Sequence, residues 1–291
     1  MAAHGSFLSH REFLWLRRAG WVALAAVAAY VAYDPIGGRN GGTAMGYALG
    51  GIGAALILWL SWLGVRKRSF AGRRARRARP TPPEQAAQTL KGWTSAHVYL
   101  GLALLVIGTL HTGFEFGWNV HTLSYALMVV VILSGIYGVF AYARYPALQS
   151  ENLGGESVEK IRRVLGDIDQ SLTRLAGRLP DSFAGPVRDS IVRTRIGGGA
   201  LALLSGSSRS CATARALRQS RAAALEDHGG EPAAVSELIA LLSRKADLCA
   251  RLRRDNAFKA RMDAMLWVHV PVTIALIASL IAHVFIVFFY W

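Results

Sequence analysis

The chain has 291 residues, of which 53% are hydrophobic, and it carries a formal net charge of +15. Its mean hydropathy of +0.30 is too high for an ordinary soluble enzyme, and also for a disordered or nucleic-acid-binding chain with this charge. The combination predicts an integral membrane protein whose apolar and basic parts lie in different solvents. The two cysteines form no Cys-x-x-Cys motif, which excludes a disulfide framework, a cysteine-bound metal site and covalently attached haem.

Five segments are long and apolar enough to cross a bilayer, which takes about 20 helical residues. Trp and Tyr lie near many of their ends, as expected at a membrane interface. We therefore expect an all-α integral membrane protein with five transmembrane helices. The predicted spans are residues 13–33, 45–65, 93–110, 120–142 and 265–291.

Lysine and arginine are concentrated in alternate loops. Nine lie in residues 66–91 and nineteen in residues 146–261, whereas residues 34–43 contain one and residues 112–119 contain none. Because basic loops stay in the cytoplasm, we expect the N-terminus inside and the C-terminus outside a bacterial-type inner (cytoplasmic) membrane. The basic run 66–79 directly follows a span, so we expect it to contact membrane lipid and not nucleic acid.

A long insertion separates the fourth and fifth spans. Apolar residues recur near a 3.6-residue period over 156–179, which predicts an amphipathic helix, and a further helix over 231–254 is expected to lead almost directly into the fifth span. The insertion contains no Walker loop, dinucleotide fingerprint or flavin-type motif. We expect three parts: spans 1–4 in residues 1–145, a mainly helical cytoplasmic insertion in 146–261, and the fifth span in 262–291.

Four histidines lie inside predicted spans in two matched pairs. His97 and His111 are 14 residues apart in the third span, and His269 and His283 are 14 apart in the fifth. Fourteen residues complete almost four helical turns, so each pair shares one helix face with its members about 21 Å apart along the axis. The two helices run parallel because one span separates them. His97 is therefore expected level with His269, and His111 level with His283.

This arrangement suits two haem groups, because a porphyrin iron takes one imidazole from each side. We expect a four-helix core that binds two haem b, with the metal ligands His97 and His269 toward the cytoplasm and His111 and His283 toward the outside. Small residues would leave room for a flat macrocycle, although they also serve plain helix packing, as expected for Gly46-x-x-x-Gly50. The small residues in question are Gly101, Gly108, Ser134, Gly135, Gly138 and Thr273.

His121 opens the fourth span on the outer side. It is a candidate to hydrogen-bond a haem propionate, to bind quinone, to relay protons with Glu115, or to replace His111 as a ligand. The simplest alternative is an interfacial histidine that faces water.

With these four histidines and their helix order, the chain resembles the diheme b-type membrane cytochromes. That class includes the cytochrome b of quinol-oxidising complexes and the ferric-reductase-like transmembrane proteins, and the resemblance covers residues 93–143 and 262–291. It implies transmembrane electron transfer. The chain departs from the ferric-reductase-like group in having no sixth helix and no C-terminal flavin and nicotinamide domain.

We accordingly expect an electron-transfer subunit of a membrane oxidoreductase complex, working between a quinone pool and a partner redox protein. Cytochrome c, an iron–sulfur protein or a flavoprotein are the candidate partners. One alternative is a ferric-reductase-like haem core served by a separate flavoprotein. The other is a haem-based redox sensor that signals through the cytoplasmic insertion.

Overall fold

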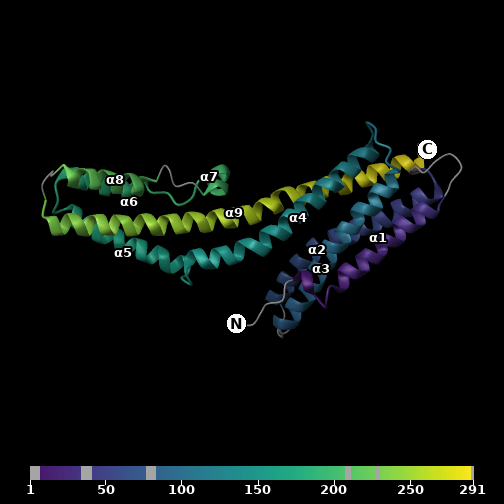
Figure 1. The fold of residues 1–291 in the computed structure, drawn as a ribbon, viewed down its shortest axis with the longest axis horizontal. Coiled ribbons are helices and arrows are strands. Elements are labelled where there is room, and N and C mark those ends of the chain that lie inside the picture. The colour runs from purple at the N-terminus through teal and green to yellow at the C-terminus, as the bar shows by residue number, and fades with distance from the viewer. Residues whose placement is uncertain (1–6, 34–40, 77–82, 207–210, 227–229, 290–291) are drawn as a thin grey trace. The chain divides into compact units, whose positions relative to one another are not determined.

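The structure is a computed structural model that describes residues 7–33, 41–76, 83–206, 211–226 and 230–289. Within these ranges every regular element is a helix, which confirms the predicted all-α fold (Figure 1). The helices are η1 Phe7–Ser9, α1 Leu14–Ala32, α2 Ala44–Arg76, α3 Pro83–Thr112, α4 Val120–Leu153, α5 Val158–Ala176, α6 Asp181–Arg193, α7 Ala200–Ser205, α8 Ala212–Leu225 and α9 Pro232–Phe289.

Five of these helices are long and apolar enough to span a membrane, as predicted: α1, α2, α3, α4 and α9. Helix α9 has 58 residues, so it is about 87 Å long and far exceeds the hydrocarbon thickness of about 30 Å. The helix expected over 231–254 is therefore the first part of α9, continuous with the fifth span. No glycine or proline occurs between Pro232 and Pro271 to end it.

The chain forms two compact units, to which α4 and α9 both contribute. Residues 1–139 and 265–291 form the first, called here the membrane unit, and residues 140–264 form the second, called the helical unit.

The core of the membrane unit is built by α2, α3, α4 and α9. Helix α1 packs against α3, where Ala19 contacts Tyr99 and Ala103. The other side of α1 exposes Trp21 and Val31, an apolar surface of the kind that lipid covers. The buried side chains of the four-helix core are Ile57, Leu60, Leu104, Met128, Ile132 and Leu276.

Polar groups also link the helices of this unit. The hydroxyls of Ser124 on α4 and Ser279 on α9 lie 2.7 Å apart. Such pairs stabilise helix association where water is absent. Near the end of the apolar part of α2, the Arg66 guanidinium lies 4.2 Å from the ring centre of Trp93 on α3. The side chains of residues 67–79, most of the predicted basic run, lie outside the described residues.

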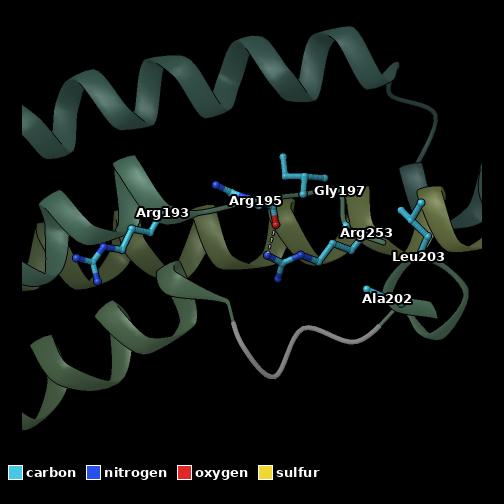
Figure 2. A pocket seen from close by; sticks show the side chains of 9 residues that line it. Arg193, Arg195, Gly197, Ala202, Leu203 and Arg253 are labelled. Atoms are coloured by element: carbon cyan, nitrogen blue, oxygen red, sulfur yellow. Dashed lines mark hydrogen bonds between the residues drawn. The ribbon is translucent and has the colours of Figure 1, made fainter. Parts of the chain in front are cut away.

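The helical unit contains α5, α6, α7, α8 and the first part of α9. Helix α5 agrees with the predicted amphipathic pattern, and the Ser157 hydroxyl caps it by accepting from the Lys160 N–H at 3.1 Å. The connection from α6 to α7 is fixed to α9, because the Arg253 guanidinium donates to the Arg195 carbonyl at 2.6 Å (Figure 2).

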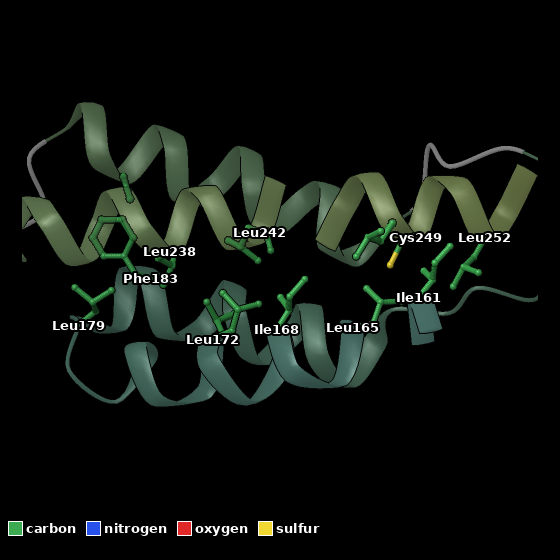
Figure 3. Close-up of a cluster of buried hydrophobic side chains, with 14 residues drawn as sticks. Ile161, Leu165, Ile168, Leu172, Leu179, Phe183, Leu238, Leu242, Cys249 and Leu252 are labelled. Carbon is green, nitrogen blue, oxygen red and sulfur yellow. The ribbon is translucent and has the colours of Figure 1, made fainter. Parts of the chain in front are cut away.

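Apolar side chains from α5, α6 and α9 meet in the core of the helical unit (Figure 3). A charged side chain is buried next to this core: Lys245 is only 2% exposed. Its Nζ lies 2.6 Å from Asp169 Oδ1 and donates to the Ser190 carbonyl at 2.9 Å. The ammonium is thereby paired and hydrogen-bonded, as a buried charge must be.

Candidate metal centres in the membrane unit

Two pairs of imidazoles meet between α3 and α9. The ring centres of His97 and His269 are 6.1 Å apart, with 57° between the ring planes. Those of His111 and His283 are also 6.1 Å apart, with 72° between the planes. The structure thus brings together the two pairs expected from the sequence, and their pairing requires α3 and α9 to run in the same direction.

The spacing within each pair suits one shared metal ion. Metal–nitrogen bonds of about 2 Å on opposite sides of an ion place two imidazole ring centres about 6 Å apart. Both pairs have this spacing, 6.1 Å. The members of each pair come from different helices, α3 and α9, so both rings could bind one ion held between these helices.

Backbone carbonyls of α2 hold two of these rings. His97 Nδ1 lies 3.2 Å from the Leu60 carbonyl oxygen, and His111 Nδ1 lies 2.8 Å from that of Gly46. A carbonyl only accepts, so Nδ1 carries the hydrogen in both rings and Nε2 keeps its lone pair. Metal-binding histidines have this arrangement, with one nitrogen donating to an oxygen and the other on the metal.

A hydroxyl of α4 holds a third ring. Ser134 Oγ donates to the Val131 carbonyl at 2.8 Å, so it accepts from His269 Nδ1 at 2.9 Å. The sequence had suggested Ser134 only as a small residue near a macrocycle. For His283, the described residues offer no oxygen acceptor.

Two glycines of α2 lie against the ring of His111, in the His111–His283 pair. A Cβ on Gly50 would stand 2.7 Å from His111 Cε1, so only glycine lets α2 approach the ring this closely. Gly46 supplies the carbonyl bound by the same ring. Their spacing of four residues places them on one helix face. This spacing predicts that another helix approaches α2 closely, but it does not identify the side chain that makes the contact.

The other expected small residues differ in their surroundings. No atom lies within 4 Å of where a Cβ on Gly101 would stand, so space is open beside α3 at that level. Gly108 accommodates Met128 and Gly138 accommodates Met265, whose Cε atoms would lie 2.6 and 2.7 Å from an added Cβ. Two residues lie directly at His269: a Cβ on Gly135 would be 3.5 Å from its Cε1, and the Thr273 hydroxyl donates to its carbonyl.

His121 lies close to both members of the His111–His283 pair. Its ring centre lies 5.1 Å from that of His111 and 4.9 Å from that of His283, and one nitrogen from each of the three rings lies within 4.8 Å of the others. The three ring centres therefore form a triangle with sides of 4.9, 5.1 and 6.1 Å. Three imidazoles form a donor set that suits zinc, copper or iron. Glu115 is not part of the group that the described residues form.

Fold and site together define a multi-pass helical membrane protein with two histidine centres in a four-helix core. Comparison with protein-family models, curated proteins and solved structures finds no match to this chain.

Proposed function

We propose that this chain is a diheme b-type cytochrome that carries electrons across a membrane between a quinone pool and a partner redox protein. The observation that supports it is the matched geometry of the pairs His97–His269 and His111–His283, each with ring centres 6.1 Å apart. Haem, when bound, supplies one-electron redox chemistry that these side chains lack.

The residues around the pairs suit such a group. The carbonyls of Leu60 and Gly46 and the hydroxyl of Ser134 would fix the rings of His97, His111 and His269 and leave Nε2 of each free to bind iron. The open space at Gly101 leaves room beside the His97 side of α3. The apolar core between the helices would limit the access of water to both centres.

Haem stoichiometry tests the proposal. A pyridine haemochrome assay on the purified full chain should find two haem b per chain. His97→Ala and His269→Ala should lose the same haem, and His111→Ala and His283→Ala the other. His10→Ala, which changes a histidine outside both pairs, is the control and should retain two. If all four variants kept both haems, the proposal would fail.

A second candidate function concerns only the centre formed by His111, His121 and His283. The convergence of His111, His121 and His283 within 4.8 Å also suits a single non-haem metal ion. In that case the purified chain should contain one haem and one equivalent of zinc, copper or iron by elemental analysis. His121→Ala would then release the metal, whereas a diheme chain with the same substitution would keep two haems.

A further inference from the structure

A cavity of about 290 Å³ lies in the helical unit, between the connection from α6 to α7 and helix α9 (Figure 2). Three arginines line it: Arg193, Arg195 and Arg253. No acidic residue is among the lining residues. The rest of the lining is Ile196, Gly197, Gly198, Ala202, Leu203 and Gly206.

A backbone contact holds Arg253 at the wall of the cavity. Its Nη2 donates to the Arg195 carbonyl at 2.6 Å. Its Nη1 is buried and makes no hydrogen bond to an oxygen within the part of the chain that the structure describes. Because Arg253 lines the cavity, an anion bound there would lie close to the guanidinium charge and would partly balance it.

The positive charge at the cavity is only partly neutralised. Arg193 is paired with Asp189, with 3.3 Å between Nε and Oδ1. The Arg195 side chain has no ion pair within the described ranges. Burial raises the pKa of the nearby Cys211 thiol, but backbone N–H groups and the hydrogen bond and charge of Arg253 outweigh burial, so this pKa lies below its ordinary value.

The remaining lining suits a small ligand with an apolar part. No atom lies within 4 Å of a Cβ position on Gly197, so a ligand can approach the backbone there. Ile196, Ala202 and Leu203 provide apolar surface. The volume lies near the lower limit for ligand pockets, about 300 Å³, and therefore restricts the ligand to a small molecule.

We propose that this cavity binds a small phosphate-bearing anion, with the Arg195 and Arg253 guanidinium groups on a phosphoryl group. The planar donors of arginine match phosphoryl oxygens in a fork, and a doubly charged group balances two uncompensated guanidinium charges. The phosphoryl group can belong to a soluble metabolite or to a lipid headgroup. The inference is independent of the haem proposal, because every residue involved lies in the helical unit.

Calorimetric titration of the purified full chain in neutral detergent tests this site, with pyrophosphate and ADP as probes. We expect saturable binding that Arg195→Ala weakens at least tenfold. Arg195→Lys should give an intermediate loss, because it keeps the charge and removes the fork. Arg188→Ala, which changes an exposed arginine of α6 outside the cavity, is the matched control and should bind as the unmodified chain does.

Adding phosphatidylglycerol to the same titration separates the two sources. If phosphatidylglycerol competes with pyrophosphate, the ligand is a lipid headgroup. If phosphatidylglycerol does not compete, the ligand is a soluble metabolite. The proposal is overturned if neither pyrophosphate, ADP nor phosphatidylglycerol binds saturably. It is also overturned if Arg195→Ala, with an unchanged melting temperature, binds as tightly as the unmodified chain.

Discussion

At the scale of single residues, three of the four paired histidines have an oxygen partner at Nδ1. Nδ1 of His97, His111 and His269 donates to an oxygen of α2 or α4, and Nε2 is left for a ligand. The oxygen also fixes the rotation of the ring. Removing one such oxygen tests whether these contacts hold metal-binding rings in place.

Ser134→Ala removes the acceptor of His269 Nδ1. Loss of the hydrogen bond that a metal-binding histidine donates from its other nitrogen typically lowers metal affinity by about 10–100-fold. We therefore expect faster haem loss from the His97–His269 centre, measured as the rate of haem transfer to apomyoglobin. Ser124→Ala is the matched control, because it removes a hydroxyl on the same helix that bonds Ser279 and no histidine. Equal rates for the two variants would contradict this role of Ser134.

Gly50→Ala places a methyl group 2.7 Å from His111 Cε1 and should displace that ring. The haem or metal content of the His111–His283 centre should fall, while the His97–His269 centre stays occupied. Gly51→Ala is the control, because no atom lies within 4 Å of its Cβ position. Both changes gain a similar helix propensity of about 0.5–1 kcal/mol, so their difference isolates the contact with the ring. An intact outer centre in Gly50→Ala would argue against the geometry.

At the scale of elements, α5 and α9 show how an amphipathic helix and a buried charge combine. Ile161, Leu165, Ile168 and Leu172 of α5 recur every three or four residues and are buried in the core of the helical unit. Lys245 of α9 forms an ion pair with Asp169 of α5. Helices α5, α6 and α9 are therefore joined by one ion pair and its hydrogen bonds to Ser190.

Lys245→Met should destabilise the helical unit. Breaking a fully buried pair typically costs about 3–5 kcal/mol, but the Asp169 side chain is 32% exposed and water partly compensates it, so we expect about 2 kcal/mol. Urea unfolding of the full chain in detergent measures the change. Lys160→Met is the control: its pair with Glu156 is exposed, and its loss should cost less than about 1 kcal/mol. Equal losses would show that burial of Lys245 does not matter.

At the scale of the whole molecule, five helices are long and apolar enough to span a membrane. If each of them crosses it, residues 14 and 289 lie on opposite sides. If the chain crosses the membrane at each of the five helices, 32 of its 33 lysines and arginines lie on the same side. We propose that this side is the cytoplasm. The His97–His269 centre would then lie toward the cytoplasm and the His111–His283 centre toward the outside.

Reporter fusions measure this orientation. Alkaline phosphatase, which is active only outside the cytoplasm, should be active when fused after Glu115 or at the C-terminus and inactive when fused after Gly177. The physical reason is the distribution of charge, since basic segments resist transfer across the membrane. The reverse pattern of activity would invert the assignment of both centres.

Local periodicity encodes the features of this protein that can be predicted without a structure. A run of about 20 apolar residues predicts a span, and a spacing of 14 predicts two histidines on one helix face. Both signals lie within a single helix, so no knowledge of packing was needed to find the spans or to expect His97 opposite His269. The sequence also predicted that a helix over 231–254 leads almost directly into the fifth span, and glycine and proline are absent between Pro232 and Pro271.

The contacts between different helices became known from the packed structure. The acceptors of His97 and His111 are backbone carbonyls, which every residue has and no sequence pattern marks. The position of His121 beside the outer pair and the burial of Lys245 likewise depend on helices distant in the sequence. Such contacts follow from how helix faces fit together, and that fit is a property of the packed chain and not of any one segment.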